Sequence, residues 1–431
     1  MMCKASSKKL ILSSLLSLTL FAAGVPVIAD QPVSDGFKIA ETDWPWWRGP
    51  HRNGQANPAQ RPPQQWSEAE NIVWKSPIAG RGYGSPIIFG DRVALVTSDE
   101  KLGSQSVVCL DRKSGKQLWT SVIHESGGMR KNSKSTSAST TPAWDGERLI
   151  VNFANSDALV ATAIDLNGKK LWQREISKYV EHQGYGSSPT VYQNLVFINS
   201  DNKGGGAIAA LDRRNGEVVW KRDRPTKPNY PSPTVLNVAG RDQLIIIGCD
   251  QTLSLDPLTG KTLWEVEGAT TECVTSTVTD GQRIFTSGGY PKNHISAVRA
   301  DGSAKVEWEI GERVYVPSLL CRDGYLFGVL DAGIAACWKS DSGKEMWKGR
   351  LGGTFSASPV MVGDVIFATN ESGETFVFHA SSEKFDLLQK NKLGEEVLAT
   401  PVIVGSQIFY RATIMEAGNR QEYMFCIGKS N

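Results

Sequence analysis

Residues 209–220 read Ala-Ala-Leu-Asp-Arg-Arg-Asn-Gly-Glu-Val-Val-Trp and contain the pattern Asp-x-x-x-Gly-x-x-x-Trp, here Asp212, Gly216 and Trp220. Recurrence of such a pattern at a regular spacing indicates a repeat architecture. A decayed copy at residues 379–388 has Leu388 at the Trp position, which brings the number of positions to eight. The other Trp positions are Trp74, Trp119, Trp172, Trp264, Trp308 and Trp347.

A second element, Ser/Thr-Pro followed by two apolar runs joined by a turn, alternates with the first. It recurs with spacings of 56, 47, 44, 44, 42, 40 and 42 residues. The proline or its equivalent is at Pro86, Pro142, Pro189, Pro233, Thr277, Leu319, Pro359 and Pro401.

Each unit contains four short runs rich in Val, Ile, Phe, Leu and Thr, separated by Gly, Asp and Asn turns. Four strands per repeat of about 40–45 residues are typical of a β-propeller blade. We therefore expect an all-β, eight-bladed propeller. A Trp strand at 71–75 has no blade before it, and a strand at 422–427 has no Trp strand after it. These terminal strands should complete the last blade together.

The repeat resembles the tryptophan-docking motif Ala-x-Asp-x-x-x-Gly-x-x-x-Trp of the pyrroloquinoline quinone (PQQ) propeller family. In that family the Trp stacks on a small residue two places before the Asp. The resemblance covers residues 72–431 and implies that the Trp residues seal each blade against the next. The small residues here are Cys109, Ala163, Ala210, Ser254, Ala297, Cys337, Val377 and Cys426.

Two kinds of relative share that fold: the quinoprotein alcohol dehydrogenases and a non-enzymatic scaffold lipoprotein of the outer-membrane β-barrel assembly machinery. The dehydrogenases carry adjacent cysteines, a Ca²⁺ site and long insertions. This chain has no Cys-Cys pair and short blades, and it lacks the Cys-x-x-Cys-His of a haem appendage. The resemblance thus favours a scaffold without cofactor, and PQQ with Ca²⁺ belongs only to the alternative of a dehydrogenase.

The N-terminus has the organisation of a secretory signal peptide. Lys4, Lys8 and Lys9 precede an apolar stretch over residues 10–27, and Val27-Ile28-Ala29 offers a small-residue cleavage site. We expect residues 1–29 to be removed and the protein to be periplasmic or secreted, with an uncleaved anchor helix as the alternative. Residues 30–71 would form a Trp- and Pro-rich leader packed on the propeller of residues 72–431. The stretch Trp44 to His51 resembles the leader of many exported members of the family.

Charge and residue spacing argue against several classes of function. The 431 residues carry 47 Lys and Arg against 45 Asp and Glu, without a block of like charges, so nucleic acid is a poor candidate partner. The five histidines lack the spacing of metal ligands, and no Gly-x-Ser-x-Gly elbow is present, so we expect neither a metal nor a catalytic residue. Six cysteines follow the signal segment, in or beside apolar strands, and free buried thiols are expected, although one disulfide stays possible.

The loops that join each Trp strand to the next blade should meet at one rim of the channel. They carry aromatic and charged residues, and such a mixed face suits peptide or small-ligand binding. The alternative is that the aromatics merely plug or cap the channel. Glu272, Glu395 and Glu396 are on the remaining loops. The candidate binding residues here are Arg81, Tyr83, His182, Tyr185, Tyr230, Arg313, Tyr315 and Phe355.

One of these loops is about ten residues longer than the others, because 23 residues separate Trp119 from Pro142. Insertions in propellers often mark a binding face. Arg130, Lys131 and Lys134 are therefore candidate partner contacts, the alternative being a solvated loop. Altogether the sequence predicts an exported binding or assembly scaffold of the cell envelope, a monomer at most peripheral to the membrane, whose partners are envelope proteins or peptides. A ligand-sensing module and a quinoprotein dehydrogenase are the alternatives.

Overall fold

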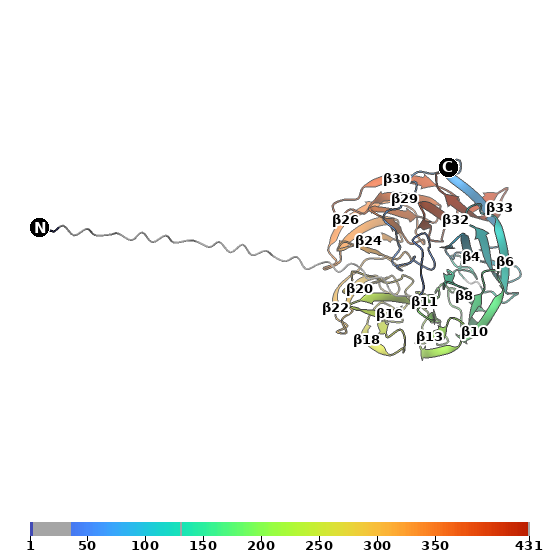
Figure 1. Ribbon diagram of the computed structural model, residues 1–431, viewed down its shortest axis with the longest axis horizontal. Coiled ribbons are helices and arrows are strands. Elements are labelled where there is room, and N and C mark those ends of the chain that lie inside the picture. The colour runs from blue at the N-terminus through green and yellow to red at the C-terminus, as the bar shows by residue number, and fades with distance from the viewer. Residues whose placement is uncertain (3–35, 130–131, 430–431) are drawn as a thin grey trace.

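The computed structural model describes residues 1–2, 36–129 and 132–429. Every regular element within these ranges is a β-strand. Eight sheets form around a ring, as Figure 1 shows, and in seven of them the four blade strands follow one another along the chain. The prediction of an all-β, eight-bladed propeller is confirmed. Over the same ranges, no helix is present that could cross a membrane.

The first four blades are continuous in sequence. Blade 1 consists of β3 (Ile87–Phe89), β4 (Arg92–Asp99), β5 (Ser104–Asp111) and β6 (Gln117–His124). Blade 2 consists of β7 (Ala143–Trp144), β8 (Leu149–Asn155), β9 (Ala158–Ile164) and β10 (Lys170–Lys178). Blade 3 consists of β11 (Thr190–Tyr192), β12 (Leu195–Asn199), β13 (Ala207–Asp212) and β14 (Val218–Asp223). Blade 4 consists of β15 (Thr234–Val238), β16 (Arg241–Gly248), β17 (Gln251–Leu255) and β18 (Thr262–Glu267).

The last four blades include the closure of the ring. Blade 5 consists of β19 (Val278–Thr279), β20 (Arg283–Gly288), β21 (His294–Arg299) and β22 (Val306–Ile310). Blade 6 consists of β23 (Leu320–Arg322), β24 (Tyr325–Leu330), β25 (Ile334–Lys339) and β26 (Glu345–Arg350). Blade 7 consists of β27 (Val360–Val362), β28 (Val365–Thr369), β29 (Glu374–His379) and β30 (Leu387–Lys392), with β1 (Gln55–Ala56) added in parallel to β27. Blade 8 consists of β31 (Val402–Val404), β32 (Gln407–Glu416), β33 (Asn419–Ile427) and β2 (Ile72–Ile78).

The seam of the ring is in blade 8, where both ends of the propeller meet. Strand β2 pairs antiparallel with β33, so that Ile72 lies opposite Ile427 and Ile78 lies opposite Glu422. In Figure 1 the blue N-terminal strand runs beside the C-terminus at this seam. The predicted closure by both terminal strands is confirmed, and it leaves no unpaired edge inside the blade.

The repeated Trp side chains join neighbouring blades. Six of the seven donate their indole N–H to a backbone carbonyl of the next blade, at 2.7–3.0 Å. The rings of five of these six also lie over the hairpin glycine of that blade. The exception is Trp347, because the hairpin of blade 7 has no such glycine. A Cβ added at Gly216, for example, would be 2.6 Å from the Trp172 ring. The six residues are Trp74, Trp119, Trp172, Trp220, Trp308 and Trp347.

Trp264 is the exception among the expected docking residues. Its indole N–H donates instead to the Gln243 side chain of its own blade at 2.7 Å, and Gln243 in turn donates to Ala300 O of blade 5 at 2.8 Å. The hairpin of blade 5 is two residues longer, and its glycine, Gly302, is not in contact with Trp264. Trp264 is therefore linked to the next blade through the Gln243 side chain, whereas the other indoles donate directly to a carbonyl of that blade.

The decayed repeat position needs a correction. Pairing in blade 7 shifts so that Phe378 lies opposite Leu387 and Val377 lies opposite Gln389. Leu388 is thus the bulged residue, equivalent to Leu171 before Trp172 in blade 2. The position that corresponds to the repeat Trp is Gln389, not Leu388, because each outer strand contains this one-residue bulge.

A tryptophan of the leader replaces the missing one. Phe197, Phe285, Phe327 and Phe409 each contact the repeat Trp of their own blade, and the equivalent residue of blade 7 is Phe367. The leader residue Trp66 stacks on Phe367 with ring centroids 6.4 Å apart. Its backbone N–H also donates to Asn391 on β30 at 3.0 Å.

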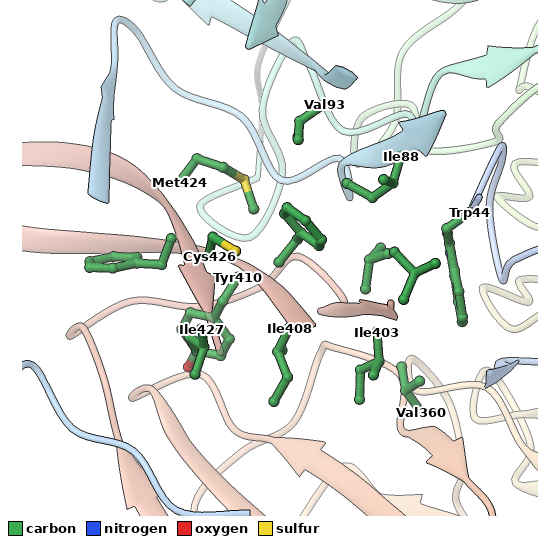
Figure 2. Packing of buried hydrophobic residues seen from close by; sticks show 14 of the residues in the cluster. Trp44, Ile88, Val93, Val360, Ile403, Ile408, Tyr410, Met424, Cys426 and Ile427 are labelled. Carbon is green, nitrogen blue, oxygen red and sulfur yellow. The ribbon is translucent and has the colours of Figure 1, made fainter. Parts of the chain in front are cut away.

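The rest of the leader closes one end of the channel. Trp44 and Ile88 exchange two backbone hydrogen bonds of 2.7 and 3.0 Å, and Trp144 N donates to Pro45 O at 2.8 Å. Figure 2 shows Trp44 facing Ile88, Ile403 and Val360, which come from three different blades. The leader residues 44–56 therefore pack across the inner strands rather than along one blade.

The six cysteines in the described part of the chain are Cys109, Cys249, Cys273, Cys321, Cys337 and Cys426. All are buried free thiols, as expected. The repeated aspartates are structural, as Asp111 illustrates: its carboxylate accepts hydrogen bonds from the backbone and hydroxyl of Ser114 at 2.8 and 2.6 Å. Neither group provides a reactive site.

Substituting Gly216 by alanine should destabilise the fold more than the same change at Gly240. Both glycines have a positive φ, +72° and +76°, so each Ala variant loses about 1–2 kcal/mol to backbone strain. Only at Gly216 does the new Cβ meet the Trp172 ring, which should cost about 1–3 kcal/mol more. Urea unfolding followed by circular dichroism measures the difference. Equal losses for the two variants would mean that the Trp–Gly contact does not hold the blades together.

Candidate binding cavity

A cavity of about 600 Å³ opens at the rim of the central channel. Most of its lining comes from the loops that connect the outer strand of one blade to the inner strand of the next. The opposite end of the channel is occupied by the leader. The site is therefore a cup with one open end.

A ring of eight hydroxyl side chains surrounds the channel, and six of them line the wall of this cup. Every blade has Ser or Thr two residues before its inner strand begins. The backbone N–H of one such residue donates to the side-chain oxygen of its equivalent in the next blade. Six of these links measure 2.9–3.2 Å. The Ser/Thr of the Ser/Thr-Pro element thus ties the blades together around the channel. The ring consists of Ser85, Thr141, Ser188, Ser232, Ser276, Ser318, Ser358 and Thr400.

The floor of the cup is Trp47 of the leader. Its indole N–H donates to Ser276 Oγ at 2.8 Å, which fixes the ring against the hydroxyl wall. Nearby, the buried guanidinium of Arg48 donates to the Leu319 carbonyl. Burial alone lowers the pKa of Arg48 to about 9, so this group remains cationic at neutral pH.

Four of the predicted rim aromatics line the cavity: Tyr83, Tyr185, Tyr230 and Tyr315. Tyr185 is the most buried of them, and its hydroxyl donates to Asn199 O at 2.7 Å. Burial raises the pKa of Tyr83 and of Tyr315 to about 12, and that of Tyr230 higher still. At neutral pH these phenols are protonated and can donate hydrogen bonds.

One carboxylate faces the same cavity. Glu272 has 9% of its side chain exposed, and its Oε1 lies 3.3 Å from His182 Nε2. The Tyr230 hydroxyl is 3.5 Å from the other carboxylate oxygen. The predicted residues His182 and Tyr230 therefore meet at Glu272.

Tyr83 belongs to a charged network at the junction of blades 8 and 1. Its hydroxyl donates to Glu396 Oε1 at 2.5 Å, and Arg81 lies 3.2 Å from the same oxygen. Arg420 also lies 3.2 Å from that oxygen. Arg81 is thus placed beside the cavity and is engaged with Glu396.

The long loop of blade 1 extends over the cavity mouth. Lys134 lines the cavity, and its ammonium group is 2.7 Å from Glu371 of blade 7. Asn132 donates to Gln183 at 2.7 Å on the other side. Arg130 and Lys131, predicted as partner contacts, lie outside the described residues.

Two other predicted residues do not line the cavity. Phe355 is 1% exposed and packs against Phe376 with centroids 6.1 Å apart, because its loop turns the ring into the core between blades. Arg313 lies over the Tyr315 ring, 5.0 Å from its centroid, and donates to Gly289 O at 2.7 Å. Arg313 therefore supports a lining residue from behind.

The sequence did not mark Trp47 and Tyr290 as lining residues, and it placed Glu272 only on a rim loop. Trp47 is far from the repeat in sequence, so its place on the floor depends on how the leader folds back. Tyr290 follows β20 rather than a Trp strand, and its carbonyl accepts from Glu272 N at 3.2 Å. That bond joins a loop between two blades, which carries Glu272, to the loop between β20 and β21 of blade 5 at the cavity opening.

The donor set does not suit a metal centre or PQQ. Within residues 36–129 and 132–429, no group of three or more His, Cys, Asp or Glu side chains is placed to hold a metal ion. PQQ is a tricarboxylate, whereas the buried ionisable acid of the cup is Glu272 and its lysine, Lys134, is already paired. The cysteines of the described ranges are singly buried in strands, so none forms the adjacent pair of the quinoproteins.

Comparison with known proteins identifies the family. The model of the family described as outer membrane protein assembly factor BamB matches residues 65–184 and 105–349. The two matches together span residues 65–349, more than half of the chain. The chain belongs to this PQQ-like propeller family. The resemblance inferred from the Trp repeat is confirmed.

Curated relatives of this PQQ-like propeller include a dehydrogenase and an outer membrane protein assembly factor. A polyvinylalcohol dehydrogenase of Sphingopyxis sp. is 24% identical over 371 residues, 78% of this chain and 48% of the relative. BamB of Pseudomonas aeruginosa is 26% identical over 160 residues, 36% of this chain and 37% of the relative. The chain spans less than half the length of each of these relatives.

Solved structures show the same fold. BamB from Moraxella catarrhalis superposes with a TM-score of 0.58 at 12% identity, over 82% of this chain and 96% of that one. A europium-containing methanol dehydrogenase gives a TM-score of 0.63 at 10% identity, over 90% and 98%. At such identities the likeness concerns the fold alone, and a fold does not specify a function.

Proposed function

We propose that this chain is an exported, non-catalytic binding propeller that serves as a scaffold in the cell envelope. The observation that carries the proposal is the cup itself, closed by Trp47 and open at the rim, with walls of hydroxyl and phenol groups. These groups hold ligands through hydrogen bonds and apolar contact. The rim would hold an envelope protein or a peptide.

The leader is part of the same proposal. Residues 30–71 act with the propeller of residues 72–431, because the leader supplies both the floor residue Trp47 and the docking residue Trp66. Residues 1–29 serve as a cleaved signal peptide that delivers the protein to the periplasm or the medium. The mature protein would be a monomer, peripheral to the membrane at most.

The family supports a binding role but includes enzymes as well. One relative is named as an outer membrane protein assembly factor and another as a polyvinylalcohol dehydrogenase. The lining chemistry favours the assembly-factor role. The buried carboxylate of Glu272 would repel an anionic cofactor, and Lys134 is already paired with Glu371. A scaffold also needs no cofactor.

Calorimetric titration of the mature protein with PQQ, with and without Ca²⁺, tests the non-catalytic part of the proposal. We expect no saturable heat and no dye reduction when simple alcohols or polyvinyl alcohol are added, because Glu272 disfavours an anion in the cup. The Glu272→Gln variant, titrated in the same way, controls for this charge. Ca²⁺-dependent binding with turnover would establish the dehydrogenase alternative.

A further inference from the structure

Two charged residues that line the cup, Lys134 and Glu272, differ in whether an oppositely charged group is paired with them. Lys134 forms an ion pair of 2.7 Å with Glu371, which also accepts a hydrogen bond from Ser356 Oγ at 2.6 Å. This lysine therefore already has an anionic partner. Glu272 faces His182, and an imidazole is a cation only when protonated.

The hydrogen-bonding capacity of the Glu272 carboxylate is also only partly used. Hydrogen bonds between a carboxylate and a charged or hydroxyl donor usually measure 2.5–2.9 Å. The two contacts of Glu272 in the cavity measure 3.3 and 3.5 Å. Because a carboxylate has about four lone-pair sites, Glu272 can accept further donors from a ligand.

Several aromatic residues line the same cavity as this carboxylate. Tyr230 and Tyr315 are close enough to Glu272 for its charge to raise the pKa of both phenols, after the larger effect of burial. Tyr290 lies beside Glu272 through the backbone bond, and Trp47 forms the floor. Aromatic faces attract cations, most strongly where water is excluded.

We propose that the cup binds an organic cation, an ammonium or guanidinium group on a larger body, with Glu272 as its counter-ion. The inference rests on the proposed binding function and adds the chemical class of the ligand. The cation enters from the open rim, donates to the free acceptor sites of Glu272 and lies against the tyrosine rings. The cavity of about 600 Å³ also holds the body that carries the charge. The neutral hydroxyl wall contacts that body.

Two kinds of ligand could supply such a cation. One is a free amine, and the other is a lysine or arginine side chain of a peptide. Both can be tested by calorimetric titration of the mature protein. The probes are spermidine and the methylamides of Nα-acetyl-lysine and Nα-acetyl-arginine. The corresponding norleucine derivative is the neutral control, and the glutamate derivative is the anionic control.

We expect the cationic probes to bind about 10- to 100-fold more tightly than norleucine, as hydrogen bonds to a charged group predict. Tighter binding of spermidine indicates a free amine, and tighter binding of the lysine or arginine derivative indicates a side chain. Either result supports the proposal. Equal binding of lysine and norleucine derivatives, or a preference for the glutamate derivative, would overturn it.

The variant Glu272→Gln keeps the shape of the side chain and removes its charge. It should weaken the cationic probes by the same 10- to 100-fold and leave norleucine unchanged. Glu395→Gln, on the same rim but exposed and hydrogen-bonded to Met415 N, is the matched control and should change nothing. Tyr315→Leu is a second variant and should weaken the cations about 2- to 10-fold. If neither Glu272→Gln nor Tyr315→Leu affects the cations, the assignment is wrong.

The failure of this proposal and that of the proposed function are distinguishable. The cation probes report only on the chemistry of the cup. If they do not bind while PQQ is also rejected and an envelope protein still contacts the rim, the ligand class is wrong and the scaffold role stands. If PQQ binds with turnover, the scaffold role falls whatever the amines do.

Discussion

Replacing Trp66 by alanine will lower the free energy of unfolding by about 3–5 kcal/mol, as much as replacing a Trp of the repeat itself. Trp66 is outside the repeat in sequence, yet it is 3% exposed and stacks on Phe367. Four of the other blades, blades 3, 5, 6 and 8, place a repeat Trp against the equivalent phenylalanine. The loss should therefore match that of Trp220→Ala in blade 3.

The physical cause is packing rather than hydrogen bonding. The Trp66 indole N–H has no hydrogen-bond acceptor within the described residues, whereas Trp220 donates to Pro257 O at 3.0 Å. The cost at Trp66 then comes from the cavity left against Phe367 and β30. Trp66→Phe should restore part of the stability, because it keeps an aromatic ring against Phe367.

Urea unfolding followed by circular dichroism measures these losses without depending on tryptophan fluorescence. Trp47→Ala is the matched control, since Trp47 is a leader tryptophan that lines the cavity and is only half-buried. Its loss should be clearly smaller. A Trp66→Ala protein as stable as the unmodified one would show that the leader does not complete the ring.

Most of the fold follows from the repeat. The spacing of Asp212, Gly216 and Trp220 determines a hairpin whose glycine receives the previous blade's tryptophan, and this geometry holds wherever the three residues recur. The prediction was wrong at Leu388, because a repeat written as letters does not show the bulge that places Gln389 opposite Val377. It was incomplete at Trp264, where a longer hairpin shifts the contact to Gln243.

The site could be predicted only in part. Tyr83, Tyr230 and Tyr315 lie three or four residues before the Pro position of each inner strand, so their loops indicated the rim. Whether a side chain enters the cavity depends on loop conformation, which placed Tyr185 on the wall and Phe355 in the core. Trp47 reaches the floor only because the leader crosses the inner strands of several blades, and such long-range packing leaves no periodic signal.

The leader makes the two ends of the channel different. Ion pairs and hydrogen bonds of Arg81, Glu396 and Lys134 fix the loops at the open end. At the other end, β1 pairs with β27 and Trp44 pairs with Ile88. A ligand of the cup would therefore enter from the rim, and a protein partner that uses the cup would have to dock on the rim.

The second large effect is expected in living cells, at the rim. A photo-reactive benzoyl-phenylalanine in place of Tyr290, which is 54% exposed beside Glu272, should form a discrete adduct with an envelope protein on irradiation. The same residue in place of Leu118, 47% exposed on the outer strand of blade 1, should not, because that position is remote from the cup.

This cross-linking measurement tests the central claim, that the protein is a scaffold which binds a partner at its open end. The account predicts an adduct at position 290 whose other component mass spectrometry identifies as an exported protein, with none at position 118. No adduct at position 290, or the same adduct at both positions, would contradict it.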